Sequence, residues 1–330
     1  MTIRIAINGF GRIGRTILRQ ILSLKHNGDI TVVCINDIAS IETLAYLFKY
    51  DSAFGPLSDS VSTDGSNLVV NTKKIPFFNS AEFTALDLSD VDVVLECTGN
   101  VRSRKVAEQG LAAGARAVVI SGPSDHADVT AVIGANEGAI QDAKIVSNSS
   151  CTTNAIAPLL NYIDKCLGVE RAHITTIHCY TNSQPLVDAP RCDAARSRAA
   201  AESIVPTTTS AAKELQKILP DVGSRTSISS VRVPSLSVSA IDATLQLVNS
   251  VGMSSTDILK ASAENLPVIG QVVDPCVSRD LRARPESLIL ALPETVIVGD
   301  TQIRLFGWYD NEWGFSARMI EMSRLLAARP

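Results

Sequence analysis

Apolar and polar positions in the first half of the chain alternate between short apolar strands and stretches of helical spacing. Residues 3–7 form an apolar strand, and apolar residues recur at the spacing of one helical face over residues 17–22. The same pattern predicts strands at residues 31–36, 91–97, 117–120, 130–133 and 144–146, and a helix at residues 102–113. Strands that alternate with helices in this way predict a Rossmann-type, doubly wound parallel sheet. Residues 46–83 indicate short strands with turns at 55–56 and 64–65, but not their order.

After residue 150 the pattern changes, because the strands become longer, alternate in polarity and have few helices between them. Strands are expected at residues 172–180, 226–233, 237–249 and 302–309, and helices at residues 209–219, 256–263 and 311–326. Alternating strands of this kind predict a mostly antiparallel sheet. The chain is therefore expected to be an α/β protein with a first domain over 1–150, an α+β catalytic domain over 151–312, and a C-terminal helix, 313–330, that packs back on the first domain.

A glycine-rich loop joins the first strand to the first helix. Its glycines follow the pattern Gly-x-Gly-x-x-Gly, and this strand–loop–helix context is the one that dinucleotide binding requires. The second strand ends in Asp37, 23 residues beyond the last glycine, where a carboxylate can bond both ribose hydroxyls and repel a 2′-phosphate. Asp37 could instead be an ordinary turn residue. The sequence predicts NAD as the cofactor, bound by Gly9, Phe10, Gly11, Arg12, Ile13, Gly14, Asp37 and Ser121.

One cysteine, Cys151, lies among small hydroxyl and amide residues between an apolar strand and an apolar helical run. At a helix N-terminus the exposed N–H groups and the helix dipole favour the thiolate, which is the form that attacks carbon. A buried structural cysteine is the alternative. The polar neighbours favour a catalytic nucleophile.

A nucleophilic cysteine needs a base, and the chain has four histidines. His26 and His126 lie in polar loops. His173 and His178 share one strand, and their odd separation predicts that they point to opposite faces. His178 is followed by a polar loop at the strand end, which favours it as the base, although a satisfied core histidine is the alternative.

Composition limits the partners of the chain. Its 330 residues are 45% hydrophobic and 19% charged, with a net charge of -4 and no long basic run, so nucleic acid and anionic membranes are not expected as partners. No apolar run is long enough to span a bilayer, and the N-terminus is too short for a secretory signal. The seven cysteines are odd in number and scattered, which indicates reduced thiols, a cytoplasmic protein and no metal site.

Several further motifs resemble those of one enzyme family. They are Ser-Cys-Thr-Thr-Asn at 150–154, Thr-Ile-His at 176–178, Tyr-Thr-Asn at 180–182, Arg-Val-Pro at 232–234 and Trp-Tyr-Asp-Asn-Glu-Trp-Gly at 308–314. With the glycine loop, they make the chain similar to the phosphorylating glyceraldehyde-3-phosphate dehydrogenases over its whole length. The closely similar erythrose-4-phosphate dehydrogenases share the motif around Cys151.

The resemblance implies a mechanism and a set of site residues. Cys151 would attack the aldehyde carbon while His178 takes the thiol proton and holds the oxyanion, and hydride transfer to NAD would leave a thioester that inorganic phosphate cleaves. It implies that the phosphorylated aldehyde and inorganic phosphate are held by Ser150, Thr152, Thr181, Thr209 and Arg232, and the nicotinamide carboxamide by Asn311. It also implies a homotetramer.

The chain departs from the family pattern near the phosphate sites. Ala195 stands where the family usually has a phosphate-binding arginine, Ser183 where many members have Asp, and Ser210 where most have Gly. We expect weaker binding of inorganic phosphate, because an arginine at a neighbouring position would point its stem elsewhere. An erythrose-4-phosphate or other phosphosugar-aldehyde dehydrogenase, or a catalytically idle paralogue with a binding role, are the alternative functions.

Overall fold

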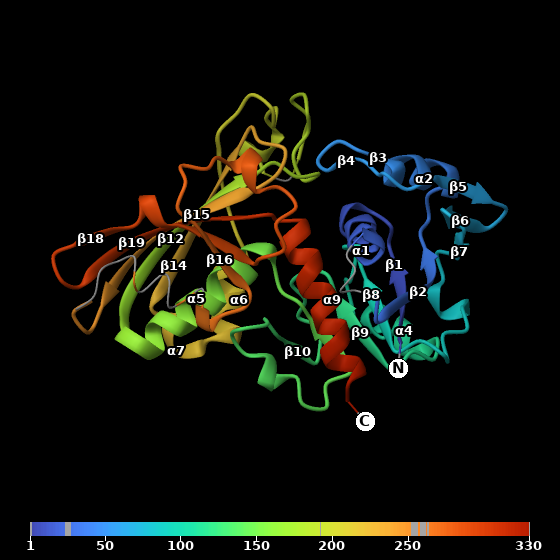
Figure 1. The fold of residues 1–330 in the computed structure, drawn as a ribbon, viewed down its shortest axis with the longest axis horizontal. Helices are drawn as coiled ribbons and strands as arrows, with labels where there is room; N and C mark the ends of the chain where they lie inside the picture. The colour runs from blue at the N-terminus through green and yellow to red at the C-terminus, as the bar shows by residue number, and fades with distance from the viewer. Residues whose placement is uncertain are drawn as a thin grey trace. The chain divides into compact units, whose positions relative to one another are not determined.

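The computed structural model describes residues 2–23, 28–191, 193–251, 257, 262 and 264–329 (Figure 1). These residues divide into two compact units. The first unit comprises Met1–Ala131, Gly138–Ser149 and Ser316–Pro330, and the second comprises Val132–Glu137 and Ser150–Phe315. The helix expected at residues 256–263 lies outside the described residues except at 257 and 262.

The first unit is built on a nine-stranded sheet in the order β10-β11-β9-β8-β1-β2-β7-β6-β5. Its strands are β1 Ile3–Asn8, β2 Ile30–Asn36, β5 Val61–Asp64, β6 Asn67–Val70, β7 Lys73–Phe78, β8 Val93–Glu96, β9 Ala117–Ile120, β10 Val129–Thr130 and β11 Ile145–Ser147. All pairs from β10 to β7 are parallel, and only the β5–β6–β7 edge is antiparallel. The predicted doubly wound sheet is therefore confirmed. A separate antiparallel pair joins β3 Tyr50–Asp51 to β4 Gly55–Pro56.

Two helical features and one strand of this unit differ from the sequence expectation. The helices are α1 Arg12–Ser23, α2 Ile41–Lys49, α3 Arg104–Ala107 and α4 Gln109–Ala112. Helix α2 was not predicted, because its aromatic residues favour strands locally, although Leu44 and Phe48 are buried one turn apart. The helix expected at residues 102–113 is broken at Glu108. The strand expected at 130–133 ends at Thr130, because the chain enters the second unit at Val132.

The second unit contains an eight-stranded sheet in the order β13-β14-β12-β15-β19-β17-β16, with β18 also paired to β19. The strands are β12 Val169–Cys179, β13 Val205–Thr207, β14 Thr226–Val233, β15 Ser239–Leu247, β16 Ile269–Val272, β17 Leu288–Ala291, β18 Val296–Val298 and β19 Gln302–Tyr309. The sheet is mostly antiparallel as predicted. The pairs β12–β14 and β16–β17 are parallel.

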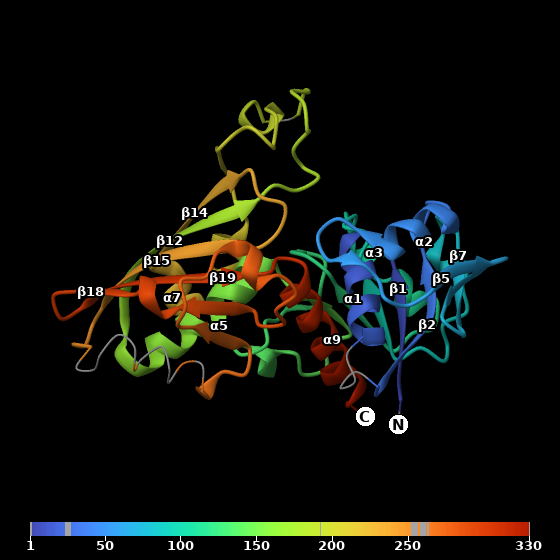
Figure 2. The same cartoon turned by 45° about the horizontal axis from the view of Figure 1, so that its top comes forward.

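The two faces of this second sheet have different environments. Helix α5, Cys151–Leu167, buries Ile156, Leu160 and Ile163 in one core with the strand residues Ile174 and Leu245. We call this side the inner face and the opposite, polar side the outer face. Figure 2 shows β14, β12, β15 and β19 side by side in this sheet. The remaining helices of the unit are α6 Ala211–Ile218 and α7 Pro220–Ser224.

Helix α9, Trp313–Ala327, is the last described element, as the C-terminal pattern predicted. From Ser316 onward it belongs to the first unit. There Arg324 makes two bonds to the Asp29 carboxylate, at 2.8 and 2.9 Å, and Arg329 donates to the Ala143 carbonyl at 2.8 Å. None of the described helices combines the length and apolarity needed to cross a membrane.

Candidate active site

The glycine loop after β1 forms a tight turn with one open position. Gly9 has φ +92°, and a Cβ on it would lie 2.6 Å from the Cys97 backbone. A Cβ on Gly14 would lie 2.2 Å from the Gly9 carbonyl oxygen, so α1 packs against the loop at this glycine. A Cβ on Gly11 would meet nothing within 4 Å. The open space at Gly11 therefore leaves room for a pyrophosphate at the N-terminus of α1, and the loop fits a dinucleotide.

Asp37 lies at the end of β2 and is tied to this loop. Its Oδ2 accepts a hydrogen bond from the Phe10 N–H at 2.6 Å, and its Oδ1 accepts one from the Ala39 N–H at 2.9 Å. The carboxylate is partly exposed. Asp37 is thus fixed beside the loop, as the predicted ribose contact requires, and it also holds the loop backbone.

The other predicted cofactor residues of the first unit lie around the same strand ends. Arg12 begins α1 and pairs with Asp51 at 2.5 Å. Ile13 follows it in the first turn of α1, and Ser121 follows β9 directly. These residues follow the carboxyl ends of β1 and β9, and such strand ends form ligand sites in parallel sheets.

Sequence reasoning missed a buried polar network beneath the glycine loop. Asn8 donates to Glu96 Oε2 at 2.6 Å and accepts from Asn36 Nδ2 at 2.9 Å. All three side chains are at least 95% buried. Burial is the main cause that raises the pKa of Glu96, while its bonds to Thr98 and Asn8 act in the opposite direction. The network joins the ends of β1, β2 and β8, so it stabilises the loop from below.

In the second unit, Cys151 is the first residue of α5. Ser150 is the N-cap, and its Oγ accepts the Thr153 N–H at 3.0 Å. The preceding Ser149 has φ +56°, an uncommon conformation for a residue with a side chain. The local sequence thus places Cys151 at a helix N-terminus, as predicted.

His178 lies at the end of β12 and contacts the nucleophile candidate. The distance from Cys151 Sγ to His178 Nε2 is 3.6 Å. The other ring nitrogen, Nδ1, lies 2.7 Å from the Cys179 carbonyl oxygen, which also accepts from Arg232 Nη1 at 2.9 Å. A proton on Nδ1 satisfies that carbonyl and leaves the Nε2 lone pair directed at the thiol. The geometry therefore favours the tautomer that a general base needs.

The charges at this pair differ from the sequence expectation in one respect. Burial, followed by the Arg232 charge, lowers the pKa of His178 to about 4, so the imidazole is neutral at physiological pH. Burial also raises the pKa of the Cys151 thiol, and Arg232 and Thr152 oppose this effect without outweighing it. The expected resting thiolate is therefore not favoured. The pair is instead a neutral thiol 3.6 Å from a neutral imidazole.

A buried tyrosine that sequence analysis did not select braces this pair. Tyr309 is 1% exposed, and its hydroxyl lies 2.9 Å from Thr152 Oγ1 and 2.7 Å from Thr176 Oγ1. Its ring meets the His178 ring edge to face at 6.0 Å. Alternate residues of β19 are buried, and Tyr309 is the last of them. This alternation in the sequence could have indicated that Tyr309 points into the core. Tyr309 therefore links α5 to β12 beside Cys151 and His178.

The remaining predicted site residues of the second unit lie on β14, after the ends of β12 and β19, and before α6. Arg232 is opposite His178 in the parallel ladder. Thr181 follows β12, with its hydroxyl 3.0 Å from Ser183 Oγ, and Thr209 precedes α6, with its hydroxyl accepting the Ala211 N–H at 3.1 Å. Asn311 follows β19.

Cys179 is a further residue near the site that sequence analysis did not assign. Its thiol donates to Asn311 Oδ1 at 3.2 Å. The Cys179 side chain is 1% exposed, and burial raises its pKa. A neutral thiol at this position holds the carboxamide of Asn311 in one orientation.

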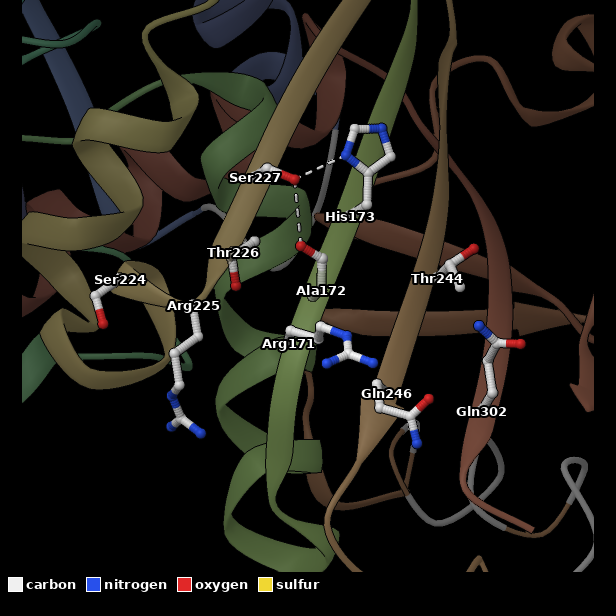
Figure 3. Close-up of a pocket in the computed structure, with 10 residues that line it drawn as sticks. All are labelled: Arg171, Ala172, His173, Ser224, Arg225, Thr226, Ser227, Thr244, Gln246 and Gln302. Atoms are coloured by element: carbon white, nitrogen blue, oxygen red, sulfur yellow. Dashed lines mark hydrogen bonds between the residues drawn. The ribbon is translucent and has the colours of Figure 1, made fainter. Parts of the chain in front are cut away.

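A hollow of about 480 Å³ lies on the outer face, away from the Cys151–His178 pair. Figure 3 shows His173 in this hollow, on β12, with Nδ1 2.8 Å from Ser227 Oγ on β14. His173 is exposed and His178 is buried on the inner face. The prediction that the two histidines face opposite sides is confirmed. Of the other two, His126 lies in a loop and His26 lies outside the described residues.

Within the described part of the chain, no three His, Cys, Asp or Glu side chains gather in a way that could hold a metal ion. The six cysteines in that part carry free thiols. Cys151 has the neutral imidazole of His178 beside it, and the Arg232 guanidinium lies 3.1 Å from that ring.

Comparison with known proteins gives matches in both units. The family model described as the NAD binding domain of glyceraldehyde 3-phosphate dehydrogenase matches residues 3–104, and that of its C-terminal domain matches residues 150–311. The glyceraldehyde-3-phosphate dehydrogenases of Kitasatospora aureofaciens and Xanthobacter flavus are 42% and 41% identical over 99% and 97% of this chain. That of Geobacillus stearothermophilus is 38% identical over 100% of this chain. The alignments cover 99%, 97% and 99% of these relatives, respectively.

Proposed function

Because this chain belongs to the glyceraldehyde-3-phosphate dehydrogenase family, we propose that Cys151 is its nucleophile and His178 its general base. The function is the NAD-dependent, phosphorylating oxidation of glyceraldehyde 3-phosphate to 1,3-bisphosphoglycerate. The observation that carries the residue assignment is the 3.6 Å contact between Cys151 Sγ and a neutral His178 Nε2.

The reaction begins when Cys151 Sγ attacks the aldehyde carbon. His178 Nε2 takes the thiol proton, and the imidazolium then stabilises the hemithioacetal oxygen. NAD, which the glycine loop and Asp37 would hold, would supply the acceptor for the hydride that leaves the substrate carbon. The carbon is then held as a thioester on Cys151. An oxygen of inorganic phosphate attacks the acyl carbon, the carbon–sulfur bond breaks, and the acyl phosphate leaves. His178 then returns its proton to the Cys151 sulfur.

The phosphate and cofactor contacts are assigned from the family resemblance and supported by position. Arg232 has the strongest support, because it is a partly buried cation beside His178. The Thr181 hydroxyl follows the end of β12, and the Thr209 hydroxyl precedes the start of α6. Ser150 and Thr152 flank Cys151, but their hydroxyls also cap α5 and bond Tyr309. Asn311 is proposed to hold the nicotinamide carboxamide.

Steady-state assays test this assignment against its rivals. Glyceraldehyde 3-phosphate should give NADH at a higher kcat/KM than erythrose 4-phosphate, and sustained turnover should require inorganic phosphate. A higher kcat/KM for erythrose 4-phosphate would contradict the proposed substrate. NAD binding without NADH formation from either aldehyde would instead support the idle paralogue.

Replacing Asp37 by Ala should improve NADP binding and weaken NAD binding. The change removes the charge that repels a 2′-phosphate, and it also removes the acceptor of the Phe10 N–H. We expect the ratio of the NADP and NAD dissociation constants to fall by roughly ten-fold, since charge-assisted contacts are worth about 1.5–3 kcal/mol. Fluorescence titration with NAD and with NADP measures the two dissociation constants. Preference of the unaltered chain for NADP would refute this interpretation of Asp37.

The proposed domains are 1–150 for NAD binding and 151–312 for catalysis, with the helix of 313–330 packing on the first. The two compact units support this division, although residues 132–137 belong to the second unit. Limited proteolysis followed by mass mapping would test it, because the first cuts should fall near the proposed boundaries.

A homotetramer is proposed as the functional assembly. The segment between β12 and β14, yellow-green in Figure 2, exposes Leu186, Val187 and Ile204 by 71%, 78% and 71%. Exposed apolar side chains in one segment are typical of protein interfaces. Light scattering should give four times the chain mass of 35.1 kDa, and a monomer mass would contradict the proposal.

A cytoplasmic location is proposed because the described cysteines are reduced thiols, which reducing compartments maintain. Cell fractionation tests this location directly.

A further inference from the structure

Asn311 lies in a turn between β19 and α9 whose backbone is held by the residue before it. Asp310 is 2% exposed, and its Oδ1 accepts the Trp313 N–H at 2.9 Å and the Glu312 N–H at 3.0 Å. Its Oδ2 accepts the Ala283 N–H at 2.9 Å. These bonds fix the backbone of the turn. The rotation of the Asn311 side-chain amide then decides which polar atom this residue presents.

The Cys179 thiol contacts one end of this amide. Its sulfur lies 3.2 Å from Asn311 Oδ1 and donates to it. Within the described part of the chain, no other hydrogen bond involves the Asn311 side chain. The amide nitrogen, Nδ2, therefore keeps both of its N–H groups for a ligand.

The groups around the sulfur explain why the thiol donates in this bond, although sulfur can also accept. Burial raises the pKa of Cys179 to about 12, so the thiol keeps its proton at physiological pH, and a hydrogen bond from the Ser239 hydroxyl acts in the opposite direction. His178 Nδ1 is 3.8 Å from the sulfur but 2.7 Å from the Cys179 carbonyl oxygen, which takes its proton. Because Ser239 donates to the sulfur, the thiol proton is directed to Asn311.

We infer that Cys179 is a positioning residue that sets which end of the Asn311 amide meets the cofactor. With Oδ1 occupied by the thiol, Asn311 presents Nδ2, which donates to the carbonyl oxygen of the nicotinamide carboxamide. The inference rests on the proposed role of Asn311 in holding that carboxamide. Without the thiol, the amide turns over and offers either end, since its oxygen and nitrogen ends are nearly equal in size.

Equilibrium titration of Cys179→Ala with NAD tests this inference without turnover. We expect the dissociation constant for NAD to rise by about two- to ten-fold, the usual effect of losing one neutral hydrogen bond. ADP-ribose, which has no nicotinamide, should bind as it does to the unaltered chain. The contacts of Cys179 with His178 and Arg232 are made by its backbone carbonyl, so the variant keeps them. Unchanged NAD affinity, or equal weakening of NAD and ADP-ribose, would overturn the inference.

The analogue 3-acetylpyridine adenine dinucleotide shows which end of the amide is used. It keeps the carbonyl oxygen of the nicotinamide side chain but carries a methyl group in place of the amide nitrogen. If Asn311 presents Nδ2, Cys179→Ala should raise the dissociation constants of NAD and of this analogue by the same factor. A rise for NAD alone would mean that Asn311 presents Oδ1, and the inferred orientation would be wrong.

Two further cysteine variants separate the hydrogen bond from packing. Cys179→Ser keeps a donor at the same position, so its dissociation constant for NAD should stay within about two-fold of that of the unaltered chain. A value as high as that of Cys179→Ala would count against the inference. Cys276→Ala is the matched control, because it removes a partly buried thiol of the same unit that packs against Leu281 and Ile289. An equal loss of NAD affinity in this control would also overturn the inference.

A double-mutant cycle with Asn311→Ala tests whether Cys179 acts through Asn311. Cys179→Ala should add nothing to the loss of NAD affinity in Asn311→Ala, whereas additive losses would show independent effects and overturn the inference. Unchanged NAD affinity in Asn311→Ala would refute both the proposed contact of Asn311 and the inference. The proposed function fails separately, if the unaltered chain forms no NADH from glyceraldehyde 3-phosphate. Coupling of the two residues in NAD binding would still support the positioning role of Cys179 in that case.

Discussion

Replacing Cys151 by Ser is expected to lower aldehyde oxidation by more than about a thousand-fold while NAD affinity stays nearly unchanged. Serine has the same shape but a far less nucleophilic oxygen, and a neutral His178 with a pKa of about 4 is too weak a base to ionise it. The glycine loop and Asp37 lie in the other unit, so the change leaves the cofactor contacts made there intact. Stopped-flow NADH formation and equilibrium titration with NAD measure the two quantities.

Cys166→Ser is the matched control for this variant. Cys166 is an exposed thiol near the end of the same helix, and no catalytic group is assigned near it. Its substitution should leave both rate and affinity unchanged. Residual turnover of Cys151→Ser above about one part in a thousand would show that Cys151 is not the sole nucleophile.

Replacing His178 by Asn is expected to lower kcat by roughly a hundred- to ten-thousand-fold. The amide cannot take the thiol proton, and burial already raises the pKa of Cys151. Alkylation of Cys151 by iodoacetamide should therefore shift to higher pH in the variant. An alkylation profile identical to that of the unaltered chain would place the base elsewhere.

His173→Asn is the control, because it changes a histidine of the same strand on the outer face. It should affect neither kcat nor the alkylation profile.

The pH dependence of the free energy of unfolding should also change when His178 is replaced. The folded-state pKa of His178 is about 4, below its ordinary value of 6.5, so the unfolded chain binds the proton first.

The contribution of this neutral histidine to stability is thus present above pH 6.5 and is lost as pH falls toward 4. Chemical denaturation at several pH values should show a smaller acid-induced loss of stability in His178→Asn than in the unaltered chain. An equal loss in both would mean that folding does not lower the pKa of His178.

The sequence by itself determined the features that depend on neighbours in the chain. Three spaced glycines between a strand and a helix predicted the dinucleotide loop, and the structure places each glycine where a side chain would clash or where the backbone is open. Period-two alternation separated His173 from His178, and the polar run before an apolar helix put Cys151 at an N-terminus. Such features are local, because strand and helix geometry fix which side chains share a face.

Only the tertiary structure decided which distant groups meet and how they ionise. Tyr309 bonds Thr152 and Thr176 across 157 and 133 residues, and no periodicity encodes such pairs. Arg196 bonds Thr207 across 11 residues, because the fold brings the helix Ala195–Ser197 beside the end of β13. The helix position of Cys151 favoured a thiolate, but burial reverses the direction of its pKa shift. Burial depends on everything packed around a side chain, so the state of the reactive pair follows from the assembled fold and not from the motif that contains it.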